Sequence, residues 1–156
     1  MPRHITILSI FIAILATIAS AGGLLLDGLY RDNAFVTTTW LGNDAITLFL
    51  AVPILVVAMI VSNRGSLKAQ LIWMGALDYM LYNYAFYLFG AAFNWFFLLY
   101  ATLLALSIFA LIFGLIKLDV NGISQQFRKD APVKWIGGYF IFVASGLGLV
   151  YLIQSI

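Results

Sequence analysis

Five long apolar stretches dominate this sequence and restrict what the chain can fold into. They cover residues 5–26, 41–61, 70–89, 95–116 and 135–156. Each approaches the roughly 20 residues that a helix needs to cross about 30 Å of hydrocarbon. A transmembrane β-barrel would instead show segments of about ten residues with alternating apolar and polar side chains, and the sequence has no such alternation. The pattern predicts an all-α integral membrane protein, folded as a single domain with a bundle of five transmembrane helices.

The composition agrees with a chain that is surrounded mainly by lipid. Only 9% of its 156 residues are charged and 64% are hydrophobic, whereas soluble domains carry about 25% charged residues. Cysteine is absent and His4 is the single histidine. A disulfide framework, a thiolate nucleophile and a pair of axial haem histidines are therefore excluded. We expect no cofactor.

The basic residues predict the orientation of the five helices. Of the eight Lys and Arg residues, only Arg31 lies on one side of a five-span arrangement. The other side holds Arg3, Arg64, Lys68, Lys117, Arg128, Lys129 and Lys134. Because basic residues concentrate in cytoplasmic loops, we expect a cytoplasmic N-terminus, an extracytoplasmic C-terminus and a main outer loop over residues 27–44. The expected location is the plasma membrane, as the inner membrane of a bacterium.

The first apolar stretch also has a second interpretation. Arg3, the apolar residues after it and Ala19-Ser20-Ala21 are typical of a secretory signal peptide with cleavage after Ala21. The apolar stretch continues as far as Leu26, however, which gives it the length of a full span. A retained helix is the favoured interpretation, and cleavage is left open as the alternative.

The third apolar stretch is the most polar of the five and carries Asp78 about eight residues from its inner end, near mid-membrane. On a wheel of 100° per residue, four polar side chains share the half that holds Asp78: Tyr79, Tyr82, Asn83 and Tyr87. The opposite half holds Trp73, Met74, Leu77, Met80, Leu81 and Leu88, with Tyr84 as its one polar exception. We expect the polar half to face the bundle interior and the apolar half to face lipid.

Asp78 has no Lys or Arg within any span to neutralise it. Its carboxyl group should therefore be protonated, hydrogen-bonded or paired with a bound cation. Pro53 predicts a kink that could form a cavity wall. Pro53, Ser107, Thr17 and Ser145 lie at a depth similar to that of Asp78. Together they suggest a small mid-membrane site. The alternative is that these hydroxyl groups merely bond to their own helix backbone.

Several short motifs resemble those of a known group of proteins. The runs Arg64-Gly65-Ser66, Trp73-Met74-Gly75-Ala76 and Tyr82-Asn83-Tyr84-Ala85-Phe86-Tyr87 resemble an uncharacterised family of bacterial polytopic membrane proteins. The resemblance covers roughly the second to fourth stretches and implies no activity, ligand or cofactor. Relatives of this kind usually continue into further spans, and they tend to carry a small residue where Asp78 stands.

Two functions fit these features. The first is transport or permeation of a small solute, a proton or a cation, with Asp78, Tyr79, Tyr82, Asn83 and Tyr87 lining the route and Pro53 and Ser107 beside it. The second is a non-catalytic accessory, structural or sensory subunit whose tyrosine face binds a partner helix or lipid. The expected partners are the lipid bilayer and either a homo-oligomer or a partner membrane subunit.

Other functional classes have little support in the sequence. An enzyme is not expected, because no nucleophile with a base, no paired carboxylates and no metal-ligand motif is present. Asp27, Asp32 and Asp44 could gather around a divalent cation at the outer surface, but their spacing matches no ligand loop. We therefore expect no metal. Nucleic acid is not an expected partner, because the net charge of +2 reflects the inner-loop residues.

Overall fold

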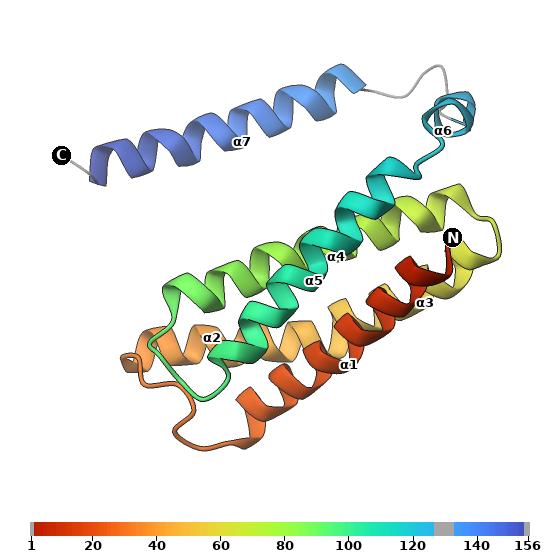
Figure 1. Ribbon diagram of the computed structural model, residues 1–156. Coiled ribbons are helices and arrows are strands. Elements are labelled where there is room, and N and C mark those ends of the chain that lie inside the picture. The colour runs from red at the N-terminus through yellow and green to blue at the C-terminus, as the bar shows by residue number, and fades with distance from the viewer. Residues whose placement is uncertain (1, 127–132, 155–156) are drawn as a thin grey trace. The chain divides into compact units, whose positions relative to one another are not determined.

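The computed structural model describes residues 2–126 and 133–154, and these ranges are helical with short connections (Figure 1). The helices are α1 (Arg3–Leu25), α2 (Ala34–Ile46), the π-helical turn η1 (Thr47–Ala51), α3 (Val52–Asn63), α4 (Leu67–Gly90), α5 (Phe97–Ile116), α6 (Val120–Gln126) and α7 (Val133–Gln154). The chain divides into two compact units, Met1–Leu118 and Asp119–Ile156. The prediction of an all-α fold is confirmed for the described residues.

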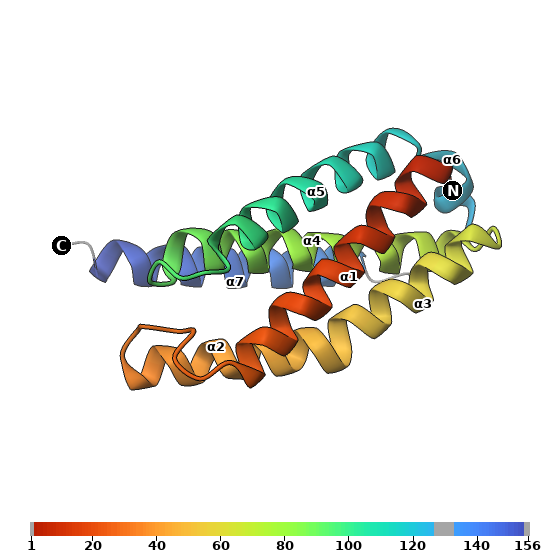
Figure 2. The same cartoon turned by 60° about the horizontal axis from the view of Figure 1, so that its bottom comes forward.

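The first unit is a bundle of four helical rods (Figures 1 and 2). One rod is formed by α2, η1 and α3, which follow one another without a break, and the others are α1, α4 and α5. α1 packs against α5 and against α2 and α3, while α4 packs against α3 and α5. The four rods therefore surround one common core.

The second rod begins earlier than the sequence pattern predicted. Asn33 accepts a hydrogen bond from the backbone N–H of Val36 at 3.0 Å and caps the helix there. The hydroxyls of Thr38 and Thr39 bond to carbonyls four residues back and so are satisfied within the helix. The prediction that residues 27–44 form an outer loop is wrong over most of its length, because the connection ends at Asn33 and Asp44 lies inside a helix.

Pro53 is accommodated by the π-helical turn that precedes it. A proline cannot donate to the carbonyl four residues back, here that of Phe49. The N–H of Val52 bonds instead to the carbonyl of Thr47, five residues back, so the hydrogen-bond pattern shifts before Pro53 is reached. The Pro53 side chain is exposed and lines a surface groove of about 500 Å³ with residues of α3 and α4. Its predicted role as the wall of an internal cavity is not supported.

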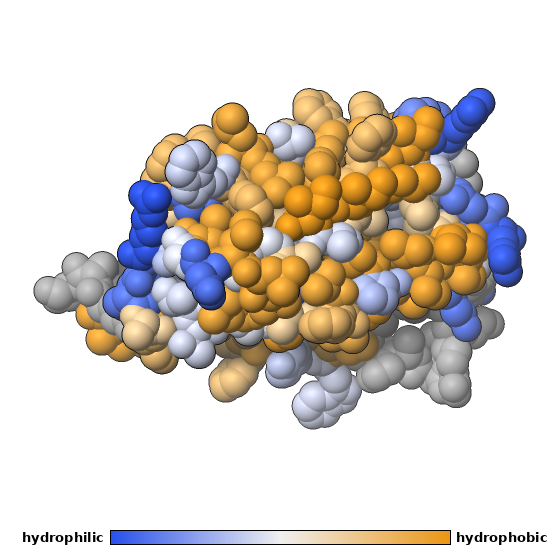
Figure 3. All heavy atoms as spheres, turned by 90° about the horizontal axis from the view of Figure 1, so that it is seen from below, coloured by the Kyte–Doolittle hydropathy of each residue, from blue (hydrophilic) through white to orange (hydrophobic). Residues whose placement is uncertain are grey.

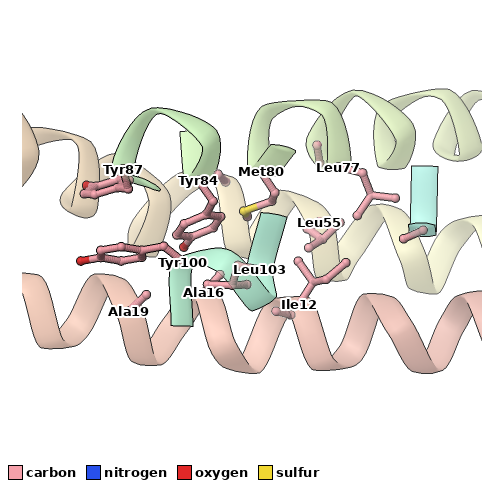
Figure 4. Close-up of a cluster of buried hydrophobic side chains, with 14 of the residues drawn as sticks. Ile12, Ala16, Ala19, Leu55, Leu77, Met80, Tyr84, Tyr87, Tyr100 and Leu103 are labelled. Atoms are coloured by element: carbon pink, nitrogen blue, oxygen red, sulfur yellow. The ribbon is translucent and has the colours of Figure 1, made fainter. Parts of the chain in front are cut away.

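Apolar side chains from all four rods fill the middle of the bundle (Figure 4). Ile12, Leu55, Leu77 and Leu103 have no exposed surface. Small residues allow the close approach between helices: a Cβ atom on Gly114 would lie 2.8 Å from the indole ring of Trp73. Such contacts stabilise helix pairs in lipid, where apolar side chains gain little by leaving the solvent.

The surface and the helix lengths both fit a membrane environment. In Figure 3, hydrophobic residues cover the middle of one face and hydrophilic residues gather toward two ends. Among the described residues, three helical segments are long and apolar enough to cross a bilayer, namely Arg3–Leu25, Ala34–Asn63 and Phe97–Ile116. The number of five spans and the orientation of the termini stay predictions.

The second unit consists of α6 and α7. Asp119 precedes α6 and accepts a hydrogen bond from the N–H of Gly122 at 2.9 Å. α7 corresponds to the fifth apolar stretch, which was predicted over residues 135–156. Arg128 and Lys129, which contribute to the predicted orientation, lie outside the described residues.

Candidate functional site

The orientation of α4 differs from the one predicted by polarity. Asp78 is exposed and Tyr82 is 67% exposed, whereas Trp73, Leu77 and Met80 are fully buried. The predicted inward orientation is thus wrong for Asp78 and Tyr82. The physical reason is that large apolar side chains fill the space between helices, and Trp73 also reaches α1, where its indole N–H donates to Ser9 Oγ at 3.0 Å.

The remaining predicted site residues do not form one group with Asp78. Asn83 and Tyr87 are buried, as expected. Tyr79 is half-buried and its hydroxyl lies 2.7 Å from Thr47 Oγ1. Ser107 is fully buried on α5, and its hydroxyl has no hydrogen-bond partner among the described residues. The structure therefore separates Asn83, Tyr87 and Tyr79 from Asp78.

A buried carboxylate on α2 organises the polar side chains instead. Asp44 is only 3% exposed. The Tyr30 hydroxyl donates to its Oδ2 atom at 2.5 Å, and the Tyr87 hydroxyl lies 2.9 Å from its Oδ1 atom and 3.1 Å from the Trp40 carbonyl oxygen. No basic side chain of the described residues pairs with Asp44. The carboxylate oxygens are therefore contacted by neutral tyrosine hydroxyls and not by a positive charge.

Tyr30 comes from the connection between α1 and α2, and its side chain is buried. Burial raises the pKa of Tyr30 well above its usual range, and the neighbouring Tyr87 and Asp44 raise it further. Tyr30 is therefore a neutral hydroxyl at physiological pH and keeps the proton that it donates to Asp44.

A glycine on α1 makes room for the Asp44 carboxylate. Gly23 is buried, and a Cβ atom at this position would overlap the carboxylate and would lie 2.6 Å from the Tyr30 hydroxyl. Any larger residue would push Asp44 or Tyr30 out of place. α1 can therefore approach α2 at this level only because residue 23 has no side chain.

A chain of amides and hydroxyls extends from Asp44 along the same rod. The Asn43 amide donates to Asn83 Oδ1 at 2.5 Å, and the Asn83 amide donates to Thr47 Oγ1 at 3.3 Å. Thr47 in turn contacts the Tyr79 hydroxyl and lies in the π-helical turn. We call Tyr30, Asn43, Asp44, Thr47, Tyr79, Asn83 and Tyr87 the Asp44 cluster. It connects the second rod to α4 by side-chain hydrogen bonds.

Aromatic rings surround one side of the cluster. The Tyr87 ring centroid lies 4.8 Å from that of Trp40, 5.0 Å from that of Tyr100 and 6.0 Å from that of Tyr84. Figure 4 shows Tyr84, Tyr87 and Tyr100 together at one end of the core. The hydroxyls of Tyr84 and Tyr100 have no hydrogen-bond partner within the described part of the chain. Buried polar groups are normally paired, so these two hydroxyls are exceptions.

Two neighbouring cavities share part of their lining, and one of them reaches Tyr87. The larger has a volume of about 550 Å³ and is lined by Arg31, Phe93, Asn94, Trp95, Phe97 and Leu98. The smaller, of about 70 Å³, shares Phe93, Asn94 and Phe97 with it and is bounded by Tyr87 and Tyr100. The smaller cavity is large enough for water or a small ion. Of the Asp44 cluster, Tyr87 thus lines the smaller of these cavities.

Asp27, Asp32 and Asp44, which were considered for a metal site, do not form one group of ligands. Asp27 is exposed, while Asp32 accepts hydrogen bonds from the Trp40 indole N–H and the Ala92 backbone N–H, both at 3.1 Å. The residues that the structure describes contain no group of three or more His, Cys, Asp or Glu side chains able to hold a metal ion.

Asp44 was missed as the centre of a site because it falls where the predicted outer loop over residues 27–44 overlaps the start of the predicted helix over residues 41–61. A usable signal was Asn33, a good N-cap residue from which the helix can be extended to residue 44. That extension places Asn43, Asp44 and Thr47 within a largely apolar helix. No local signal predicts Tyr30 and Tyr87 as the partners of Asp44, since they lie 14 and 43 residues away.

The fold and the cluster define the class: a helical protein with apolar helices long enough to cross a membrane and a buried carboxylate held by tyrosine hydroxyls. No protein-family model, curated protein or solved structure matches this chain. The resemblance to an uncharacterised family of bacterial polytopic membrane proteins stays a prediction.

Proposed function

We propose that this chain is a multi-pass protein of the bacterial inner membrane that moves a proton, a small cation or a small polar solute. The proposal places the exchange site at Asp44 in place of Asp78. The observation that carries it is the buried Asp44 carboxylate, whose two oxygen atoms contact Tyr30 and Tyr87 and which no described basic side chain neutralises.

The chemistry of a buried carboxylate supports an exchange role. A lone negative charge in a low-dielectric interior is costly unless it is paired or neutralised. Two hydroxyl donors reduce that cost but bring no positive charge. Binding a proton or a cation at Asp44 would remove the remaining charge. The same carboxylate can therefore bind a positive species, and the two hydroxyl contacts reduce the cost of releasing it.

In this proposal, the two cavities form one half of a transport route. A solute entering the larger cavity would pass Arg31 and Asn94 and would reach Tyr87, which contacts Asp44. On the other side of the cluster, the apolar core with Ile12, Leu55 and Leu103 closes the way. Transport across the membrane then requires a rearrangement of the bundle. The π-helical turn beside Thr47 is the natural place for it, because π-helical turns interrupt the regular helix hydrogen bonds.

A flux assay on purified protein in liposomes tests the proposal. Proton uptake is followed with an internal pH-sensitive dye, and Na⁺ and K⁺ uptake with radioactive tracers, across an imposed gradient of each ion. We expect flux with the wild type and its loss in Asp44→Asn, which keeps the shape and hydrogen-bonding capacity of the side chain but cannot carry the charge.

The matched control is Asp78→Asn, which changes an exposed carboxylate outside the cluster in the same way. It should keep the wild-type flux. Tyr87→Phe adds a second test, because it removes a contact to Asp44 and keeps the carboxylate. A wild-type protein without flux for all three ions would overturn the proton and cation forms of the proposal, and an Asp44→Asn variant with unchanged flux would overturn the role of Asp44.

A further inference from the structure

The smaller cavity beside Tyr87 lies where α4 ends and α5 begins. Its volume is about 70 Å³, and it is lined by the last turn of α4, the connection that follows and the first turn of α5. We call it the α4–α5 cavity. A cavity needs only about 10–15 Å³ to hold one water molecule. The α4–α5 cavity therefore has room for a small ion that keeps part of its hydration shell.

Tyr100 lines this cavity and has a buried hydroxyl group without a partner. The side chain is only 2% exposed, and its hydroxyl forms no hydrogen bond among the described residues. Figure 4 shows the hydroxyls of Tyr100 and Tyr87 on the side away from Leu77, toward the end of α4 where the cavity lies. Because buried hydroxyls are normally paired, the Tyr100 oxygen is available as a ligand for a guest in the cavity.

The end of α4 offers further oxygen atoms. The last carbonyls of a helix have no partner within the helix and carry a partial negative charge. After α1, α3 and α5, the N–H groups of Leu26, Arg64 and Lys117 donate back to carbonyls of those helices. Among the described residues no such bond closes α4, because its C-cap residue Ala91 is extended and the chain turns away. A cation is a suitable partner for such a helix end.

The groups around the α4–α5 cavity favour a cation over an anion. Its described lining contains no Lys, Arg or His, and Arg31 lines only the larger neighbouring cavity. Asp32 accepts a hydrogen bond from the backbone N–H of the lining residue Ala92 at 3.1 Å, and Asp44 Oδ1 lies 2.9 Å from the Tyr87 hydroxyl. Two aspartates thus lie one hydrogen bond away from the lining. Four of the lining residues are aromatic, and the faces of aromatic rings attract cations.

We propose that the α4–α5 cavity binds one partly hydrated monovalent cation, with the Tyr100 hydroxyl oxygen and free carbonyls at the end of α4 as its ligands. A divalent cation is not the expected guest, because it prefers carboxylate ligands and no acidic residue is among the described lining. This inference deepens the proposed function and rests on it only for the role of the guest, which is the ion that goes on to Asp44. Binding in the cavity is measurable without transport.

Equilibrium binding of radioactive Na⁺ and Rb⁺ to the purified protein in detergent tests the site, with N-methylglucamine chloride keeping the ionic strength constant. We expect saturable binding of at least one of these ions, with one ion per chain. Tyr100→Phe should weaken it about tenfold to hundredfold, because it removes one oxygen ligand of a charged guest. Tyr84→Phe is the matched control: Tyr84 is equally buried and its hydroxyl also lacks a described partner, but it is not among the described lining residues. It should keep the wild-type affinity.

Asp44→Asn separates this site from the proposed exchange site. It should keep saturable binding and should weaken it less than Tyr100→Phe does. Complete loss of binding in Asp44→Asn would place the ion at Asp44 itself, which overturns the separate site and leaves the proposed function standing. A wild type without saturable binding of either ion overturns the inference, and so do equal affinities of Tyr100→Phe and Tyr84→Phe. A wild type that binds an ion but shows no flux overturns the proposed transport and not this site.

Discussion

The hydroxyl group of Tyr87 on α4 lies 2.9 Å from the Oδ1 atom of Asp44 on α2, although 43 residues separate them in sequence. This contact connects two rods of the bundle at the level where Tyr30 binds the other carboxylate oxygen. It also places Asp44 next to the cavity that Tyr87 bounds. The same contact thus contributes to the packing of the bundle and to the proposed exchange site.

Tyr87→Phe should destabilise the protein by about 1–3 kcal/mol, because it removes a donor from a buried carboxylate. Unfolding in detergent, followed by tryptophan fluorescence, measures the change. Tyr82→Phe is the control, since the Tyr82 side chain is mostly exposed and makes no hydrogen bond within the described residues. Equal stability of the two variants would contradict the assigned role of Tyr87.

Gly23→Ala should destabilise the bundle by about 1–3 kcal/mol, because the new methyl group overlaps the Asp44 carboxylate and crowds the Tyr30 hydroxyl. Gly42→Ala provides the comparison: its Cβ meets no atom within 4 Å in the middle of α2. There, alanine should raise stability by about 0.5–1 kcal/mol through its higher helix propensity. Thermal unfolding in detergent measures both, and a neutral Gly23→Ala would show that α1 does not approach Asp44 closely.

Asp32→Ala should loosen the connection between α4 and α5. Asp32 accepts hydrogen bonds from the Trp40 indole and from the backbone N–H of Ala92, so its loss leaves two donors without their partner. We expect the free energy of unfolding to fall by about 1–3 kcal/mol and hydrogen exchange at Ala92 to become faster. The exposed Asp27 is the matched position, and Asp27→Ala should leave both quantities unchanged. Unaltered exchange at Ala92 in Asp32→Ala would argue against this contact.

Leu103→Ala should lower the free energy of unfolding by about 2–5 kcal/mol, because Leu103 is fully buried in the middle of the bundle. Phe109→Ala removes a larger side chain from the same helix, but that side chain is 54% exposed. Its cost should be clearly smaller, although phenylalanine loses more atoms. Denaturant unfolding compares the two variants, and a larger loss for Phe109→Ala would mean that a different face of α5 is buried.

The helix boundaries show how much of the fold the sequence predicts. The stretch over residues 95–116 was predicted as a helix and is found as Phe97–Ile116, and the stretch over 70–89 is found as Leu67–Gly90. Apolar length and end signals are local properties, so they can be read without the tertiary structure. The second rod was predicted too short because polar residues at 37–44 suggest a loop when their partners are unknown. Those partners are helix carbonyls and side chains of α4.

The sequence by itself therefore determined that this chain is helical, apolar and long enough in several segments to cross a membrane. Only the tertiary structure decided which face of α4 is inside and which carboxylate is buried. Trp73, Leu77 and Met80 fill the core while Asp78 stays outside, because packing between helices in lipid depends on side-chain shape more than on polarity. Asp44, Tyr30 and Tyr87 meet only when three separate segments come together, which no local pattern in the sequence records.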